Sequence, residues 1–220
     1  MVERVYLKTQ VYEYIKSAIV NNELNSESIY SEQQFADLLN VSRTPIREAV
    51  LRLNQEKLVT IHPNKGFSLR LMNRKELREL FEFRYVLEGY CCQLIVNESD
   101  GLKKDSFIRE LEELLSLEEE TIDEQNDSKH HMEVDFEFHY KIIEYSSNSL
   151  ISNQYYRLRN QMSILGIESY KRKGRPKQTL DEHKEITNAL RKKDDSIVLK
   201  ILNTHLTNAE DILASMEIRE

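Results

Sequence analysis

The segment that most constrains the fold is the run Val41–Leu51, which reads VSRTPIREAVL. Ser42 can cap a helix here, and Pro45 falls in its first turn, where the missing N–H of proline costs little. The helix has an apolar face at i, i+4 and i+7, formed by Ile46, Val50 and Leu53. Arg43 and Arg47 are four residues apart and project together from another face. Such a pair can reach phosphates and guanine edges, so the pattern predicts a DNA-recognition helix.

The residues before this helix predict its partner in a helix-turn-helix. Ser31 and Gln34 form a capping box at the start of a short helix. The helix presents an apolar stripe of Phe35, Leu38 and Leu39. Asn40 follows, and asparagine tolerates the left-handed conformation that a sharp turn between two helices needs.

A β-hairpin is expected after the recognition helix. The alternating runs Leu58–His62 and Phe67–Leu71 flank the turn residues Pro63–Gly66, whose sequence is PNKG. Lys65 at the tip can contact the DNA backbone or the minor groove. The hairpin is therefore predicted to be the wing of a winged helix.

Residues 1–71 resemble the DNA-binding domain of GntR-type bacterial transcription factors, whose recognition segment commonly reads close to S-R-T-P-x-R-E-A. The matching residues are Ser42, Arg43, Thr44, Pro45, Arg47, Glu48 and Ala49. The resemblance implies that Arg43, Thr44 and Arg47 contact operator DNA and that Lys65 and Gly66 form the wing that reaches the next groove. The chain departs from the family at Gln33, where an arginine is common. The DNA-binding residues are therefore expected to be Gln33, Ser42, Arg43, Thr44, Pro45, Arg47, Lys65 and Gly66.

Composition favours a mainly α protein. The 220 residues include only five Gly and three Pro, 31% are charged, and long spans lack helix breakers. Without a long apolar run or a signal peptide, we expect a soluble cytoplasmic protein with no membrane association. Adjacent Cys91 and Cys92 suit reduced, buried thiols rather than a disulfide.

The net charge of −7 has the wrong sign for a protein that binds a polyanion, but it is unevenly distributed. Residues 1–70 carry nine Lys and Arg against eight Asp and Glu, so all of the acidic excess lies in the remainder of the chain. A nearly neutral domain can still bind DNA if its cations share one face, and dimerisation doubles its phosphate contacts.

The second domain is predicted to be an antiparallel bundle of helices. Asn73 and Glu76 form a capping box that opens a helix to about residue 97. We expect its inward face to be Leu77, Leu80, Phe81, Leu87, Cys91 and Leu94. Further helices are expected over 105–122, 129–147, 149–169, 179–192 (capped by Thr179 with Glu182) and 195–217. The basic run Lys171–Lys177 is interpreted as a solvated loop rather than a second nucleic-acid site.

Four residues of the bundle have metal-binding chemistry. Asp135 and His139 are four apart and share a helix face, while His183 and His205 lie on apolar faces of later helices. If a carboxylate and three imidazoles converge in a core, a divalent transition metal can offset their desolvation. A histidine on an apolar face is more often a hydrogen-bonded core residue, so the residues alone leave both interpretations open.

From Leu77 onward the chain resembles the FCD ligand-binding domain of the FadR subgroup of GntR regulators. The matching motifs are E-x-R-x-x-L-E at Glu82–Glu88, D-x-x-x-H at Asp135–His139, E-H at Glu182 and His183, and the terminal His205. The resemblance implies that Asp135, His139, His183 and His205 bind zinc, nickel or manganese and that a small carboxylate effector completes the coordination. Arg84 is expected either to bind that effector or to form a salt bridge with Glu88 or another acidic residue. His130 and His131 match no ligand position and are expected to be solvated.

Together these features predict a winged helix-turn-helix of three helices and a β-hairpin over residues 1–72, followed by an all-α effector-binding and dimerisation domain over 73–220. The expected function is that of a homodimeric regulator, in particular a repressor, that binds palindromic double-stranded operator DNA. Two alternatives stay open: a DNA-binding dimer whose bundle is purely structural, and a metal-dependent hydrolase. The chain lacks H-E-x-x-H, a nucleophile elbow and a phosphate-binding glycine loop, which disfavours the enzyme.

Overall fold

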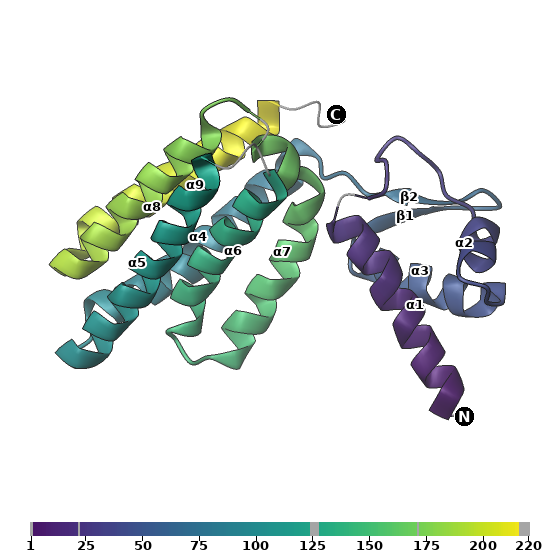
Figure 1. The fold of residues 1–220 in the computed structure, drawn as a ribbon, viewed down its shortest axis with the longest axis horizontal. Helices are drawn as coiled ribbons and strands as arrows, with labels where there is room; N and C mark the ends of the chain where they lie inside the picture. Colours follow the sequence, from purple (N-terminus) through teal and green to yellow (C-terminus); the bar gives the residue numbers. More distant parts are fainter. Residues whose placement is uncertain (1, 22, 124–127, 171, 216–220) are drawn as a thin grey trace. The chain divides into compact units, whose positions relative to one another are not determined.

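The structure, a computed structural model, describes residues 2–21, 23–123, 128–170 and 172–215. Over this part the chain is mainly helical, as its composition predicts (Figure 1). It divides into two compact units, one built mainly from the first 71 residues and the other mainly from the rest. Among the described residues no helix has both the length and the apolar character needed to cross a lipid bilayer.

The first unit has the element order of a winged helix-turn-helix. Its elements are α1 (Val2–Val20), α2 (Glu32–Leu38), α3 (Arg43–Gln55), β1 (Val59–His62) and β2 (Gly66–Leu69). The two strands pair antiparallel, with Val59 opposite Leu69 and His62 opposite Gly66. Three helices and a hairpin were predicted from the sequence, and the structure confirms them.

Local signals fix the start of α2 and the turn after it. The Ser31 Oγ accepts the Gln34 backbone N–H at 3.1 Å, and the Gln34 Oε1 accepts the Ser31 N–H at 2.8 Å. This is the predicted capping box. Asn40 has a φ of 51°, so it adopts the left-handed conformation expected of it. Ser42 is the residue before α3, but its side chain makes no capping hydrogen bond, which corrects the expected cap.

A short backbone pairing ties the wing to the helix-turn-helix. The Tyr30 N–H donates to the Phe67 carbonyl at 2.7 Å, and the Phe67 N–H donates to the Tyr30 carbonyl at 2.9 Å. The rings of Tyr30, Phe35 and Phe67 pack together with centroids 5.5–6.0 Å apart. Because Tyr30 directly precedes the cap of α2, the start of α2 and the strand β2 share one apolar core.

The second unit is a bundle of helices, as predicted. Its elements are α4 (Arg74–Val96), α5 (Gly101–Asp123), α6 (Ser128–Glu144), α7 (Ser149–Tyr170), α8 (Arg175–Lys192) and α9 (Asp195–Ser215). In Figure 1 these helices lie alongside one another. α4 packs against α6, α8 and α9, and α5 packs against α6 and α8. The predicted capping box of Asn73 and Glu76 opens α4.

Two predictions about this bundle were wrong. α8 begins at Arg175 instead of at Thr179, because Gly174 has a φ of 86° at the N-cap and Pro176 occupies the first turn. Thr179 is therefore an interior helix residue and is buried. Leu94 was expected to face inward, but it is 36% exposed, whereas the charged pair Arg84 and Glu88 occupies the buried face of α4.

Candidate nucleic-acid interface and candidate metal centre

The recognition helix α3 presents Arg43 and Arg47 to solvent. Its buried side consists of Pro45, Ile46, Ala49, Val50 and Leu53. Arg43, Thr44 and Arg47 are exposed, and the side chain of Arg43 is 63% accessible. α3 therefore has an apolar face and a separate cationic face, as the sequence predicts. Pro45 was expected among the DNA-binding residues, but its burial leaves it the role of starting the helix.

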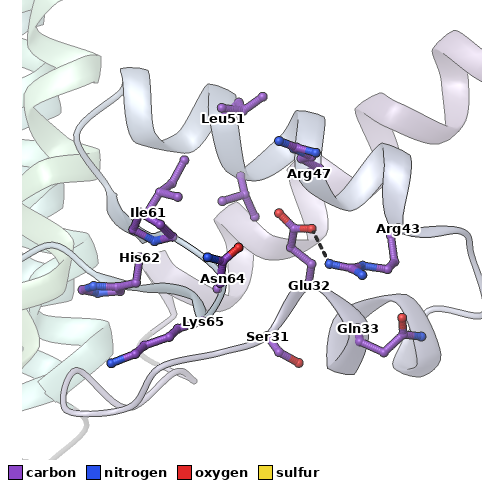
Figure 2. Close-up of a pocket in the computed structure, with 13 residues that line it drawn as sticks. Ser31, Glu32, Gln33, Arg43, Arg47, Leu51, Ile61, His62, Asn64 and Lys65 are labelled. Atoms are coloured by element: carbon purple, nitrogen blue, oxygen red, sulfur yellow. Dashed lines mark hydrogen bonds and ion pairs between the residues drawn. The ribbon is translucent and has the colours of Figure 1, made fainter.

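A groove of about 490 Å³ lies between the start of α2, the helix α3 and the tip of the wing (Figure 2). Its lining includes Gln33, Arg43, Arg47, Lys65 and Gly66, all of them predicted DNA-binding residues. Ser42 and Thr44 are exposed near the start of α3, outside this lining. The structure therefore brings residues from the helix-turn-helix and the wing to one concave surface.

Ionic and amide contacts hold the side chains at one end of the groove. Glu32, at the start of α2, reaches toward α3, and its Oε2 is 3.2 Å from the Arg43 Nη2 (Figure 2). The Gln33 Nε2 donates to the Asp37 Oδ1 at 2.7 Å. Glu32 was not singled out from the sequence, although it is the first residue of α2 and adjoins Gln33.

The wing tip depends on glycine at position 66. Gly66 has a φ of 122°, and a Cβ built there would overlap the backbone carbonyl of Tyr30. Only glycine combines that backbone conformation with so close an approach. Asn64, with a φ of 60°, completes the reversal and lets Lys65 extend outward from the tip (Figure 2).

Within the second unit, the four predicted metal ligands come together. Asp135 and His139 lie on α6, His183 on α8 and His205 on α9. One ligand atom from each lies within 4.8 Å of the others. The three histidines are at most 1% exposed, and the Asp135 side chain is 16% exposed. The cluster is therefore buried, with its carboxylate partly accessible.

The distances within the cluster suit a shared metal ion. The His139 Nε2 is 2.9 Å from the His205 Nε2 and 3.3 Å from the His183 Nε2. The Asp135 Oδ1 is 3.4 Å from the His183 Nε2 and 3.8 Å from the His139 Nε2. Ligands ~2.0–2.1 Å from one ion would lie about 3.3 Å apart in a tetrahedron. Three imidazoles and a carboxylate form a donor set that fits zinc, nickel or manganese.

Burial and neighbouring charges change the acidity of these groups in different directions. Burial would raise the pKa of Asp135, but its hydrogen bond to His183 and the nearby imidazoles hold that pKa well below its usual value. Burial, together with His139 and His183, lowers the pKa of His205 to about 3. Burial would also lower the pKa of His183, but Glu118 and Asp135 raise it to about 9. An ionised Asp135 and a neutral His205 are both competent metal ligands.

Three glutamates lie behind the histidines, and none of them was predicted as a site residue. Each has a carboxylate oxygen close to the Nδ1 of one histidine. The pairs are Glu88 with His139 at 2.7 Å, Glu118 with His183 at 3.0 Å, and Glu182 with His205 at 2.7 Å. Two of the glutamates do have a sequence signal. Glu88 lies on the apolar stripe of α4, and Glu118 continues the apolar stripe of Leu111 and Leu115 on α5.

Three other predictions are decided by burial. Arg84 is 2% exposed, and its Nε is 2.8 Å from the Glu88 Oε1, which is the predicted salt bridge. His131 was expected to be solvated, but it is 3% exposed and stacks on Tyr170 with centroids 6.1 Å apart. Arg175 belongs to the basic run interpreted as a solvated loop, but it is 3% exposed, and its Nη1 is 3.2 Å from the Glu182 Oε2. His130 is exposed, as predicted.

Two protein families match the chain, one in each unit. Residues 7–69 match the family described as bacterial regulatory proteins, gntR family, and residues 79–208 match the FCD domain. The chain is 25% identical over 199 residues to the uncharacterized HTH-type transcriptional regulator YdhC of Bacillus subtilis (strain 168), covering 90% of this chain and 87% of that protein. It is 24% identical over 208 residues to the gluconate operon transcriptional repressor of Bacillus licheniformis, covering 92% and 82%.

Solved structures share the fold. A GntR transcriptional regulator from Rhodococcus sp. RHA1 superposes with a TM-score of 0.78 at 23% identity, covering 96% of this chain and 99% of that one. The E. coli protein McbR/YncC superposes with a TM-score of 0.74 at 22% identity, covering 94% and 96%. The enzyme alternative fails, because the matching families and relatives are transcriptional regulators. The chain belongs to the GntR family of bacterial regulatory proteins, with an FCD domain after its DNA-binding helix-turn-helix.

Proposed function

We propose that the protein is a cytoplasmic, ligand-responsive repressor whose operator affinity is set by a small carboxylate bound at a divalent metal in the helical unit. The convergence of Asp135, His139, His183 and His205 carries this proposal, because four donor atoms within 4.8 Å form a ready metal-binding set. Repression is supported by the gluconate operon repressor of B. licheniformis and by the HTH-type transcriptional repressor RspR of E. coli (strain K12), which is 24% identical over 197 residues, 90% of this chain and 84% of that protein.

In this proposal residues 1–72 bind DNA and residues 73–220 bind the effector and dimerise. Arg43, Thr44 and Arg47 would read base edges in the major groove, while Gln33 and Ser42 would contact the backbone. Lys65 and the backbone of Gly66 would enter the adjacent minor groove. The exposed cations of the groove support these assignments.

A homodimer would match a palindromic operator, and α4 offers a face for it. The exposed apolar side chains of α4 are spaced about one helical turn apart: Phe83, Val86, Tyr90 and Leu94. A second copy could bury this stripe, which is unusual for a solvent-facing helix surface. Sedimentation of Val86→Glu should then show monomers, with Leu102→Glu, at the exposed start of α5, as the matched control. A dimeric Val86→Glu variant would exclude this face.

The metal would polarise and hold the carboxylate of the effector as a Lewis acid. Arg84 could contribute to effector binding, because its guanidinium lies within the same buried region, with Nη2 3.4 Å from the Tyr155 hydroxyl. An effector that binds one arrangement of the helices better than another changes operator affinity by that difference in binding free energy.

Elemental analysis and DNA binding test the proposal together. Protein purified without a histidine tag should contain about one divalent transition metal per chain, and Asp135→Ala should lose it while still binding DNA. Asp181→Ala removes an exposed aspartate on α8 and should keep the metal. A panel of small carboxylates should then stabilise the wild type thermally and change its affinity for a duplex selected from a random library. A metal-free wild type would instead favour a purely structural bundle.

A further inference from the structure

We propose that Glu88, Glu118 and Glu182 are positioning residues of the metal centre, each fixing one histidine so that its Nε2 faces the ion. This inference rests on the metal site proposed above. It assigns roles to three residues outside the ligand set, on helices α4, α5 and α8.

The three histidines share one orientation. In each, Nδ1 lies 2.7–3.0 Å from a glutamate oxygen. The opposite nitrogens converge, with the His139 Nε2 lying 2.9 Å from the His205 Nε2 and 3.3 Å from the His183 Nε2. Histidines that served only as packing would have no reason to point the same nitrogen at a common centre.

The chemistry of imidazole explains the orientation. A neutral imidazole has one N–H, and a carboxylate beside Nδ1 accepts it, which leaves the lone pair on Nε2. The same contact fixes the ring and makes Nε2 a stronger ligand. For His139 the contact with Glu88 is a close approach of 2.7 Å, and neither its Nδ1 nor the Glu88 Oε2 has a hydrogen-bond partner among the described residues.

Burying the three glutamates costs desolvation free energy, which a role in positioning the histidines would explain. Glu88 and Glu118 are at most 1% exposed, and the Glu182 side chain is 13% exposed. Buried carboxylates carry a desolvation cost that ion pairing repays only in part, so apolar residues in their place would generally be no less stable. Three such residues, each placed against a different histidine, therefore indicate a requirement of the site.

The charges of the buried set balance with a divalent ion. Asp135 and the three glutamates carry four negative charges when ionised. Arg84 pairs with Glu88 at 2.8 Å and Arg175 pairs with Glu182 at 3.2 Å, which offsets two of them. With neutral imidazoles, a divalent cation would neutralise the remaining two. The charges of the glutamates therefore match a divalent ion, and their positions match histidines that carry the proton on Nδ1.

The glutamates also extend the centre to helices without a ligand. Glu88 lies on α4 and Glu118 on α5, whereas the four ligands lie on α6, α8 and α9. Through its ligands and the glutamates that contact them, the ion would fix five of the helices relative to one another.

Glu118→Gln tests the inference, because it keeps the size of the side chain and removes its charge. Its matched control is Glu119→Gln, at the next residue of α5, where the carboxylate is exposed and pairs with Lys184. Zinc affinity is measured by competition with a chromophoric chelator, and the cobalt-loaded proteins are compared by their d–d absorption. We expect Glu118→Gln to bind zinc about 10- to 100-fold more weakly with a shifted cobalt spectrum, and Glu119→Gln to match the wild type.

Wild-type affinity and spectrum in Glu118→Gln would overturn the positioning role while leaving the metal site intact. A wild type that binds neither zinc nor cobalt would overturn the proposed site and this inference with it. If Glu118→Gln fails to fold by circular dichroism, the tautomers are read in the wild type instead. Nitrogen-15 NMR of the zinc-loaded protein should show three imidazoles that carry the proton on Nδ1 and the metal on Nε2. Coordination through Nδ1 would contradict the inference.

Discussion

Arg43 on the recognition helix is ion-paired with Glu32 at the start of α2, with 3.2 Å between the Nη2 and the Oε2. The pair is accessible to solvent, so it contributes little to stability, but Glu32 places a negative charge on the surface proposed to bind DNA. The pair also holds the guanidinium of Arg43 toward α2 in the absence of DNA.

Replacing Glu32 by Gln should strengthen binding to DNA of any sequence, because it removes a charge that repels phosphate and releases Arg43. We expect a several-fold gain in affinity for unrelated duplexes at low salt and a smaller gain for the selected operator. Fluorescence anisotropy across a salt series measures both. Glu27→Gln, which removes an exposed charge outside the groove, should have a much smaller effect. Equal affinities for Glu32→Gln and the wild type would show that the pair is irrelevant to binding.

Arg47→Ala should weaken binding to the selected operator by about 1–3 kcal/mol, the range for loss of a base-reading arginine. Its affinity for unrelated sequences should fall less, so the specificity ratio should drop. Competition binding with specific and random duplexes gives this ratio. Arg109→Ala makes the same change of charge at an exposed position of α5 and serves as the control. A uniform loss across all sequences would reassign Arg47 to the phosphate backbone.

Gly66→Ala should destabilise the DNA-binding unit by about 1–3 kcal/mol, because an alanine at a φ of 122° is strained and its Cβ overlaps the Tyr30 carbonyl. Calorimetry of the full chain should show an earlier transition for that unit and weaker DNA binding. Gly101→Ala is the control, since its added Cβ has no atom within 4 Å, and it should be neutral or slightly stabilising. A Gly66→Ala protein with wild-type melting would show that the wing can adjust freely.

Removing the metal should lower the melting temperature of the helical unit. An ion that binds only the folded state stabilises it by about 2.7 kcal/mol when its concentration is 100 times the Kd. Dialysis against a chelator, followed by addition of zinc, nickel or manganese, should lower and then restore the transition. Asp135→Ala should melt at one temperature with or without added metal. A chelator-insensitive wild type would argue against the metal site.

Metal affinity should rise with pH between about 6 and 9. Burial would lower the pKa of His183, but Glu118 and Asp135 raise it to about 9, so the ion-free protein holds a proton there that the metal must displace. Because protons and metal compete for this imidazole, the apparent affinity should increase by about tenfold per pH unit for one released proton. Isothermal titration in two buffers of different ionisation enthalpy counts the protons. A constant affinity over this range would contradict the prediction.

The sequence predicts best where the determinants are local. The capping boxes of Ser31 with Gln34 and of Asn73 with Glu76 involve residues three apart, and the structure confirms both. The expected cap of Thr179 with Glu182 was wrong because Gly174 and Pro176 start α8 four residues earlier, which leaves Thr179 inside the helix. The Glu182 carboxylate contacts Arg175 and His205, which lies on another helix.

The candidate metal centre shows the same division between local and distant determinants. The shared face of Asp135 and His139 follows from their spacing on α6, but the approach of His183 and His205 depends on how α8 and α9 pack. The resemblance to the FCD domain, and not the spacing, grouped His183 and His205 with Asp135 and His139. The sequence analysis missed the glutamates, although two of them continue apolar stripes. Glu88 recurs with Leu77 and Cys91 on the inward side of α4, and Glu118 recurs with Leu111 and Leu115 on α5.

The mutual backbone pairing of Tyr30 and Phe67 has a consequence for chimaeric proteins. It joins the entry to the helix-turn-helix with the wing, and α1 packs on α3 in the same apolar core. Substitutions at exposed positions leave that core unchanged. Chimaeras with related proteins should therefore exchange the whole unit from α1 to β2 as a single piece.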